Sequence, residues 1–377
     1  MTEQLTVKAE TVTSRVMRTP RTLDVEITAR CNLRCRYCYF FDNPALKYED
    51  LSTDEWLEFF SELGQLGVMD VFLSGGEPFM RPDLPALIEG LTRHRLRFGL
   101  SSNGMFIEDD IAASIAGSKR CNFVQVSLDG SNPETHDAAR GEDSFEGAIR
   151  SIKTLLRHGV KVMVRTTLHR KNVHDLENLA HLVLDELGVK ELAINVAGYL
   201  GACRANEDDI LRTKEERQAA MRIGLHLIEQ YDGSIAADQS NLLIEARLFG
   251  QMEAARSASA PAFANGGHLT ACGCLNYKLA VRPDGTIVPC AMLPHIELGR
   301  INQDSLTDVW QNSEALNQLR RRRGIPLTDF DFCAGCEYIP YCTGNCPGVA
   351  YTRLGQVNHP NPDSCLRRFL DERDVIF

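Results

Sequence analysis

A regular alternation of short apolar runs and amphipathic stretches between residues 22 and 196 limits what this 377-residue chain can fold into. The apolar runs predict strands, and the stretches between them carry apolar residues at helical spacing. Strands separated by helices of this length form parallel βαβ units. About six such units are expected, fewer than the eight that close a barrel. The predicted strands cover residues 24–28, 68–73, 98–101, 123–128, 160–168 and 191–196, and the predicted helices 52–66, 84–95, 109–116, 145–157 and 176–187.

Composition and charge narrow the class of protein. With 44% hydrophobic residues the chain can bury a large core, and its length favours two or three domains. It has no apolar run of 18 residues and no apolar stretch typical of a signal peptide, so we expect a cytoplasmic protein without a membrane span. A net charge of -10 argues against a nucleic-acid partner. The basic run at residues 320–323 is interpreted as a solvated helix end rather than a binding patch.

Three cysteines, Cys31, Cys35 and Cys38, follow the first predicted strand in the spacing C-x3-C-x2-C. Iron-sulfur cubanes are held by thiolates on short loops, and a cube with only three protein ligands keeps one iron open, as catalytic metal sites do. Zinc matches less well, because a structural zinc site needs a second pair nearby to complete a tetrahedron. Free core cysteines are the remaining alternative. The spacing therefore favours a catalytic iron-sulfur cluster.

With Tyr37 just before the third cysteine, the segment CNLRCRYC resembles the signature of the radical S-adenosylmethionine (SAM) enzymes. The resemblance implies that the open iron chelates the amino and carboxylate groups of SAM. An electron from the reduced cluster then splits SAM to a 5'-deoxyadenosyl radical, so the cofactor carries the chemistry and the protein supplies position and shielding. The family is known for an open barrel, so the fold implied is α/β, a partial (β/α)6 TIM-like barrel.

The SGGEP turn after the second predicted strand, with Gly75, Gly76 and Glu77, resembles the family's GGE motif, which binds the SAM amino group. Glycines let a backbone approach a ligand closely, and a carboxylate can accept from an amino group. Other polar residues end later strands, where barrels place their active sites. They are candidates for SAM contacts, with ordinary polar strand caps as the alternative: Tyr37, Ser102, Asn103, Ser127, Asp129 and Arg140.

A second cysteine group falls after residue 271 and consists of Cys272, Cys274, Cys290, Cys333, Cys336, Cys342, Cys346 and Cys365. Its layout resembles the SPASM extension, which binds two auxiliary 4Fe-4S clusters. A pair of zinc knuckles is the alternative. By the resemblance one cluster takes Cys333, Cys336, Cys342 and Cys365. The other takes Cys272 or Cys274 or both, with Cys290 and Cys346. Counting the SAM-binding cluster, three 4Fe-4S clusters are expected.

Two further cysteines, Cys121 and Cys203, match neither group and are interpreted as packing residues. The domains expected from these motifs are an N-terminal segment (1–21), the partial barrel (22–235), a linker or bridging segment (236–271) and a small cysteine-rich SPASM domain (272–377).

The resemblance implies a maturase for a ribosomally synthesised peptide, which would be crosslinked or otherwise oxidised. Ala291 stands where sulfatase maturases of this type carry an Asp as general base, which disfavours formylglycine formation. A tetrapyrrole side-chain modifier of the haem-biosynthesis type is the alternative. A non-catalytic iron-sulfur electron carrier is a third hypothesis, against which the SGGEP turn argues.

The partners expected are a precursor peptide and a flavodoxin- or ferredoxin-like reductant. Only about 30 residues precede Cys31, so a separate leader-recognition protein is expected to hold the precursor, unless the barrel mouth does so itself.

Overall fold

The computed structural model describes residues 16–41, 49–231, 233–235, 266–270 and 272–365, and isolated residues at 242, 246, 247, 250, 251, 254, 262 and 367. The first part of the predicted N-terminal segment and most of the predicted linker at 236–271 lie outside these residues. Within them, no helix is both long and apolar enough to cross a membrane.

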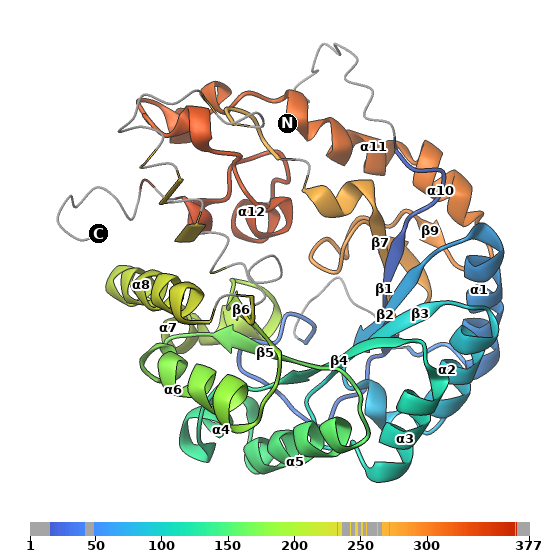
Figure 1. The fold of residues 1–377 in the computed structure, drawn as a ribbon. Helices are drawn as coiled ribbons and strands as arrows, with labels where there is room; N and C mark the ends of the chain where they lie inside the picture. Colours follow the sequence, from blue (N-terminus) through green and yellow to red (C-terminus); the bar gives the residue numbers. More distant parts are fainter. Residues whose placement is uncertain are drawn as a thin grey trace.

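Six parallel strands form an arc, as the alternation of the sequence predicts (Figure 1). Each strand pairs with the next in parallel, because a helical crossover returns the chain to the same edge of the sheet. The α/β prediction of a partial barrel is confirmed. The strands are β1 (Thr22–Thr28), β2 (Asp70–Gly75), β3 (Arg97–Ser102), β4 (Cys121–Ser127), β5 (Val162–Leu168) and β6 (Glu191–Val196).

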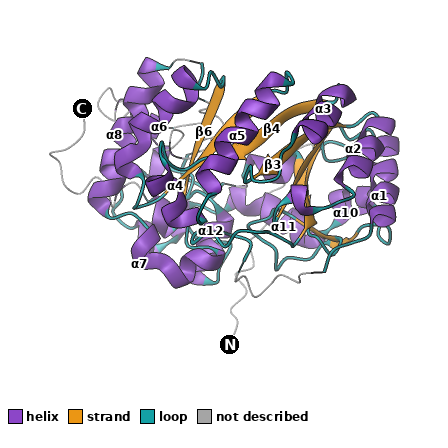
Figure 2. Ribbon diagram, turned by 90° about the horizontal axis from the view of Figure 1, so that it is seen from below, coloured by secondary structure: helices purple, strands orange, loops and turns teal. Residues whose placement is uncertain are grey.

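Helices cover the outside of the arc, and Figure 2 shows them around the strands from below. Their first member, α1 (Thr53–Leu66), begins at the predicted capping box, in which the Ser52 Oγ accepts from the Glu55 N–H at 3.3 Å and the Glu55 carboxylate accepts from the Ser52 N–H at 2.9 Å. The others are α2 (Leu84–Arg93), α3 (Asp109–Ser118), α4 (Pro133–Arg140), α5 (Ser144–Arg157), α6 (Leu176–His181), α7 (Glu207–Ile210) and α8 (Lys214–Gln230).

Two stretches differ from the sequence prediction. The helix expected over 176–187 is α6 followed by a π-helical turn at Leu182–Glu186. Helix α4 has no counterpart among the predicted helices. Its start is set locally, because the Asn132 side chain accepts from the Thr135 N–H at 3.0 Å and Pro133 occupies the first turn.

The sheet continues into the C-terminal cysteine-rich region. Strand β7 (Lys278–Val281) pairs in parallel with β1, and β8 (Thr286–Val288) and β9 (Gly299–Arg300) follow antiparallel. Buried residues on both sides of the predicted 236–271 boundary belong to one hydrophobic core, so the two regions pack as one body. The remaining helices, α10 (Leu306–Asn312), α11 (Glu314–Arg321) and α12 (Pro347–Leu354), lie on the side of the arc away from α3 and α5 (Figure 1).

The interpretation of the basic run at 320–323 as a solvated helix end is wrong for two of its four residues. Arg321 and Arg323 are exposed, but Arg320 is 7% exposed and Arg322 is completely buried. The chain leaves α11 at this point for a short 3-10 turn, Arg322–Gly324, which directs alternate side chains into the protein.

Candidate active site and cluster-binding loops

The loop that follows β1 carries Cys31, Cys35 and Cys38, all half-buried. Burial raises the pKa of all three thiols, that of Cys35 to about 12, and nearby thiolates contribute to the rise for Cys31 and Cys35. The free thiols are therefore protonated at neutral pH, and only a bound metal would convert them to thiolates. Nowhere in the described part of the chain are three His, Cys, Asp or Glu side chains arranged around one metal ion. Three half-buried thiols on one short loop are the donor set that a 4Fe-4S cluster with one open iron needs.

Backbone contacts from distant elements hold this loop. The Arg36 N–H donates to the Ala139 carbonyl of α4 at 2.9 Å, and the Ala202 N–H, after β6, donates to the Cys38 carbonyl at 2.9 Å. Tyr37 donates its hydroxyl to Asp129 and stacks on His169 at 5.4 Å between ring centroids. The conformation of the loop thus depends on the far strands of the barrel.

The SGGEP turn lies against the same loop. The Gly76 N–H donates to the Thr28 carbonyl at 2.8 Å, and the Glu77 N–H donates to the Arg30 carbonyl at 2.7 Å. A Cβ at Gly75 or Gly76 would overlap these backbone carbonyls, and Gly75 also has a φ of 130°. Both positions therefore require glycine for the two motifs to meet.

Glu77 is 1% exposed and accepts three hydrogen bonds, from the Asn103 N–H at 2.7 Å, the Ser102 hydroxyl at 2.9 Å and the Phe79 N–H at 3.2 Å. Burial raises its pKa to about 7, although these donors favour the carboxylate. Asn103 also donates to Asn32, within the cysteine loop, at 2.8 Å. The structure thus brings three of the predicted SAM contacts, Ser102, Asn103 and Glu77, together beside the cysteines.

At the end of β4, Asp129 forms a buried ion pair with Arg140 at 2.7 Å. Burial alone would raise the pKa of Asp129, but the guanidinium outweighs it and the pKa is lowered. The Thr167 N–H also donates to Asp129, at 2.7 Å. The predicted partner of the SAM carboxylate, Arg140, is therefore already paired. Ser127 is half-buried and lies beside Arg165 in the sheet.

Two buried histidines next to Asp129 were not among the predicted site residues. The Asp129 N–H donates to His136 Nδ1 at 3.0 Å, and His169 stacks on Tyr37. Burial lowers the pKa of both to about 4, so both are neutral at pH 7. His136 stands in the HDAARG segment near the predicted Arg140, whereas nothing in the sequence around His169 indicates its place.

The structure brings the first predicted auxiliary ligand set together. One cavity is lined by Cys333, Cys336, Cys342 and Cys365, with apolar neighbours that include Leu327 and Phe332. Burial, together with the neighbouring cysteines, raises the pKa of the Cys333 thiol to about 12. Four thiols around one apolar cavity fit the donor set of a 4Fe-4S cluster.

The second predicted set of auxiliary ligands, Cys272 or Cys274 or both with Cys290 and Cys346, comes from three loops. Cys272 and Cys346 both lie near Arg322, whose pKa their charges raise. The loop after Cys290 packs closely on the start of α12. A Cβ built on Gly348 would lie only 2.7 Å from the Met292 Cβ. The Cys274 side chain lies outside the described residues, so the choice between Cys272 and Cys274 stays open. Cys203 is fully buried against Ala139 and Ile210, as expected of a packing residue.

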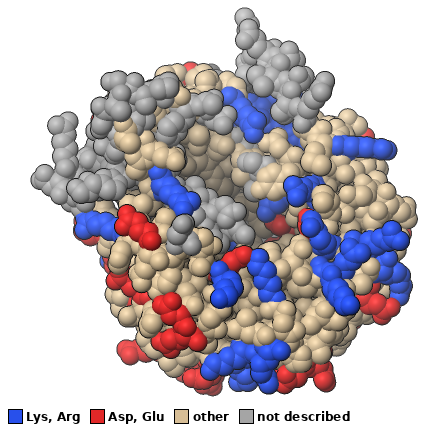
Figure 3. Space-filling model, in the orientation of Figure 1, with Lys and Arg blue, Asp and Glu red and all other residues tan. Residues whose placement is uncertain are grey.

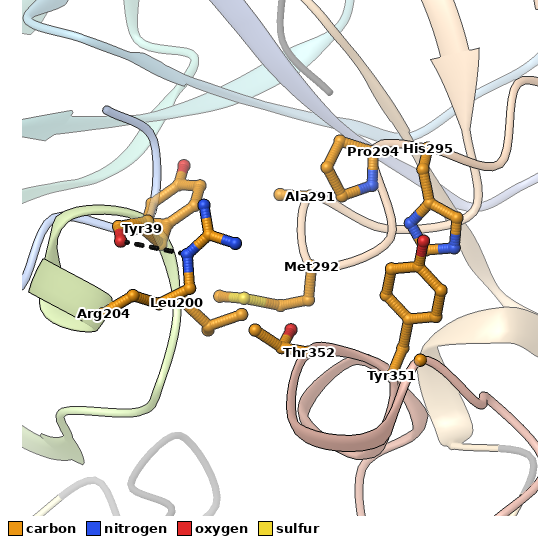
Figure 4. Close-up of a pocket in the computed structure, with 11 residues that line it drawn as sticks. Tyr39, Leu200, Arg204, Ala291, Met292, Pro294, His295, Tyr351 and Thr352 are labelled. Atoms are coloured by element: carbon orange, nitrogen blue, oxygen red, sulfur yellow. Dashed lines mark hydrogen bonds between the residues drawn. The ribbon is translucent and has the colours of Figure 1, made fainter. Parts of the chain in front are cut away.

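A cavity of about 280 Å³ lies between these cysteine groups (Figure 4). Tyr39, directly after Cys38, forms one wall, and Ala291 and Met292, directly after Cys290, form another. Tyr351, on the helix that starts after Cys346, stacks on His295 with 3.5 Å between ring centroids. Behind the first wall, the Tyr39 hydroxyl donates to Glu26 at 2.9 Å.

The face of the molecule in Figure 3 is hollowed near its middle. On this face the basic side chains of the described residues are interspersed with acidic ones rather than forming a continuous basic track.

Comparison with known proteins relates this geometry to a family. The Radical SAM superfamily model matches residues 25–183, and the SPASM model, an iron-sulfur cluster-binding domain, matches residues 272–337; together they cover more than half of the chain. The PqqA peptide cyclase of Ruegeria pomeroyi is 27% identical over 353 residues, covering 91% of this chain and 86% of that protein. The AdoMet-dependent heme synthase of Methanosarcina barkeri is 27% identical over 355 residues, covering 91% and 95%. The crystal structure of Streptococcus suis SuiB bound to precursor peptide SuiA has a TM-score of 0.68 at 16% identity, covering 93% of this chain and 76% of that one, which is a likeness of fold.

Proposed function

The chain belongs to the radical SAM enzymes that carry a C-terminal SPASM domain, and we propose that it oxidatively modifies a ribosomally synthesised precursor peptide. The relative named as a PqqA peptide cyclase supports a peptide substrate, and the likeness to the peptide-bound SuiB supports a fold able to admit one. Domains of these two families bind SAM and 4Fe-4S clusters. The count of three clusters, the domain boundaries at residues 21, 235 and 271, and the ligand assignments are part of the proposal.

The observation that carries the proposal is the position of the cavity. Its walls are Tyr39, beside the cysteine loop of the barrel, and Ala291 and Tyr351, beside two of the auxiliary cysteines. A group bound there contacts the surroundings of both kinds of cluster at once. This is the arrangement needed when hydrogen abstraction on one side is followed by electron removal on the other.

The residues of the barrel hold and orient the cofactor. Cys31, Cys35 and Cys38 would ligate the SAM-binding cluster, which together with SAM supplies the 5'-deoxyadenosyl radical. Glu77 would accept from the SAM amino group, with Ser102 and Asn103 fixing its carboxylate at 2.9 and 2.7 Å. Further contacts are assigned to the backbone of Gly75 and Gly76 and to the side chains of Tyr37, Ser127, Asp129 and Arg140.

Oxidation of a peptide also releases a proton, which requires an acceptor near the cavity. Ala291 offers none. Glu26 is 3% exposed, and burial raises its pKa to about 7, so that it can exchange a proton at neutral pH. It reaches the cavity through Tyr39, and we assign this pair the role of proton acceptor.

The peptide-modifying relative and the lining of the cavity favour the peptide over the alternative, a tetrapyrrole, which the heme synthase relative supports. Aromatic and polar groups line the cavity, including Tyr39, Arg204 and His295 (Figure 4). A separate leader-recognition protein and a flavodoxin- or ferredoxin-like reductant complete the proposed system.

The test is an anaerobic reconstitution followed by incubation with dithionite, SAM and candidate precursor peptides encoded near the gene. About 12 Fe per chain, for three four-iron clusters, is expected, together with 5'-deoxyadenosine and a mass loss in one peptide. The triple variant Cys31→Ala, Cys35→Ala, Cys38→Ala should lose the deoxyadenosine. Conversion of a porphyrin while every peptide stays unchanged would replace the peptide proposal with the tetrapyrrole alternative, and absence of deoxyadenosine would refute both.

A further inference from the structure

Arg322 is a completely buried arginine in the C-terminal region, at the start of the turn after α11. Burial lowers its pKa to about 10, which still leaves the guanidinium charged at pH 7. Removing an arginine from water costs several kcal/mol unless an anion and hydrogen-bond acceptors replace the water. We therefore expect an anion and hydrogen-bond acceptors beside Arg322.

The described residues supply only one acceptor. One terminal nitrogen of Arg322 donates to the Thr270 carbonyl, while its Nε and its other terminal nitrogen have no hydrogen-bond partner within the described part of the chain. No carboxylate there forms an ion pair with it either. Buried N–H groups without a partner are rare in folded proteins, and an ion or cofactor is a common reason for them.

The neighbours of Arg322 identify the missing anion. The titratable side chains close enough to act on its charge are those of Cys272 and Cys346, which are anionic only as thiolates. Thr270 connects it to both loops, because its hydroxyl accepts from the Cys272 N–H at 3.0 Å and its N–H donates to the Thr343 carbonyl, near Cys346, at 2.7 Å. The guanidinium thus lies where two predicted ligand loops of one auxiliary cluster meet.

Arg320, two residues earlier, is also buried but has more partners, and only one of its terminal nitrogens lacks a hydrogen bond within the described residues. It donates to the carbonyls of Leu275 and Trp310 at 3.0 and 2.8 Å, and its guanidinium lies 4.3 Å from the centre of the Trp310 ring. Backbone carbonyls and an aromatic face therefore replace most of its water. Arg322 has only the Thr270 carbonyl and two cysteine-bearing loops.

We propose that Arg322 is the counter-ion of the auxiliary iron-sulfur cluster bound by Cys272 and Cys346, donating from its free N–H groups to the sulfur atoms and raising the cluster's reduction potential. The proposal rests on the auxiliary cluster of the proposed function. A thiolate-ligated cluster is an anion, and it becomes more negative when it gains an electron. A fixed positive charge and N–H···S hydrogen bonds stabilise the reduced form more than the oxidised one. This cluster would then be the better acceptor of an electron leaving the substrate.

The experiment measures reduction potentials and needs no substrate. The full chain with Cys31, Cys35 and Cys38 replaced by alanine isolates the auxiliary clusters, for which about 8 Fe per chain is expected. Potentiometric titration followed by EPR spectroscopy then reports each cluster. In this background Arg322→Met removes the charge, Arg322→Lys keeps it, and Arg323→Met removes a charge from the exposed neighbour.

Arg322→Met should lower the midpoint of one cluster, reducing its equilibrium constant for reduction at least tenfold, or about 59 mV for one electron. The midpoint potential of the other cluster should not shift. The Arg322→Lys variant should keep both midpoints close to those of the Arg322 protein, and Arg323→Met should leave both midpoints unchanged. Loss of one cluster in the Met variant but not in the Lys variant also supports a counter-ion.

Unshifted potentials at full iron content would overturn the proposal for Arg322 and leave the auxiliary clusters standing. Loss of a cluster from the Met and Lys variants alike would overturn it as well, because charge would not be what the site requires. Absence of iron from the background chain would refute the auxiliary clusters, and with them this proposal, while deoxyadenosine formation by the wild type would still test the radical chemistry.

Discussion

Replacing Gly201 with alanine tests whether the far end of the barrel determines the conformation of the cysteine loop. Gly201 follows β6 and has a φ of 45°. A Cβ built there would lie 2.6 Å from the carbonyl oxygens of Tyr39 and Phe41 and closer still to that of Cys38. Backbone carbonyls cannot rotate away as a flexible side chain would. The third cysteine must therefore move if a methyl group is to fit.

Two effects add in this variant. Left-handed backbone costs an alanine about 1–2 kcal/mol relative to glycine. Overpacking a tightly packed site costs about 1–3 kcal/mol more. The sum, about 2–5 kcal/mol, lowers the melting temperature of a chain of this length by about 3–6 °C, at an unfolding entropy of roughly 2 cal/mol/K per residue. Because Cys38 is displaced, the SAM-binding cluster should also be lost, which is about 4 Fe per chain.

Two other glycines separate these effects. Gly67 has a φ of 73° but open space around it, so Gly67→Ala isolates the backbone cost and should lower the melting temperature by about 1–3 °C. Gly117 lies in α3 with nothing within 4 Å, and Gly117→Ala should raise it by about 1 °C. The measurements are thermal unfolding and iron content under anaerobic conditions. A Gly201→Ala protein that melts like Gly67→Ala and keeps all its iron would refute the link between β6 and the cysteine loop.

Four further predictions follow from single contacts. Asp129→Asn leaves Arg140 buried without its anion and should cost about 3–5 kcal/mol in denaturant unfolding, whereas Glu89→Gln, at an exposed ion pair with Arg93, should change little. Glu26 has a folded-state pKa of about 7, above its unfolded value, so the wild type should lose stability relative to Glu26→Gln as the pH rises from about 4.5 to 7; parallel curves would contradict this. Glu77→Gln should weaken SAM binding about tenfold to hundredfold, through loss of a charge-assisted hydrogen bond, as measured by equilibrium dialysis, and an unchanged affinity would remove Glu77 from the SAM site. Cys203→Ala should cost about 1 kcal/mol in unfolding and leave the iron content unchanged, since a lost iron would make Cys203 a ligand.

Sequence reasoning succeeded where the signal is local. The capping box of α1, the order of the strands and the meeting of the cysteine loop with Glu77 all follow from short patterns and from the rule that barrel sites lie at strand ends. The pairing of β7 with β1 joins residues more than 250 positions apart through a strand of only four residues. No periodicity in the sequence specifies such a partner.

Sequence reasoning also failed to predict which charged side chains are buried. A run of four arginines predicts a solvated surface, because arginine is rarely buried without a partner. Here the partners of Arg320 are backbone carbonyls and an aromatic ring, which are visible only in the folded chain. The ion pair of Asp129 with Arg140 was missed for the same reason, although both residues were named as candidates.

The topology of the sheet explains how the two kinds of cluster can act on one substrate. Strand β7 runs parallel to β1, and β8 returns antiparallel, so the chain reaches Cys290 level with the start of β1, whereas Cys31 lies beyond its end. Strand β1 has seven residues, and at about 3.3 Å for each residue its start and its end lie about 20 Å apart. The cavity has Tyr39, which follows the cysteine loop, and Ala291, which follows Cys290, among its walls, so a bound side chain contacts both. Because one continuous sheet sets this separation, an electron that leaves the substrate for the proposed auxiliary cluster at Cys290 would move away from the SAM-binding loop.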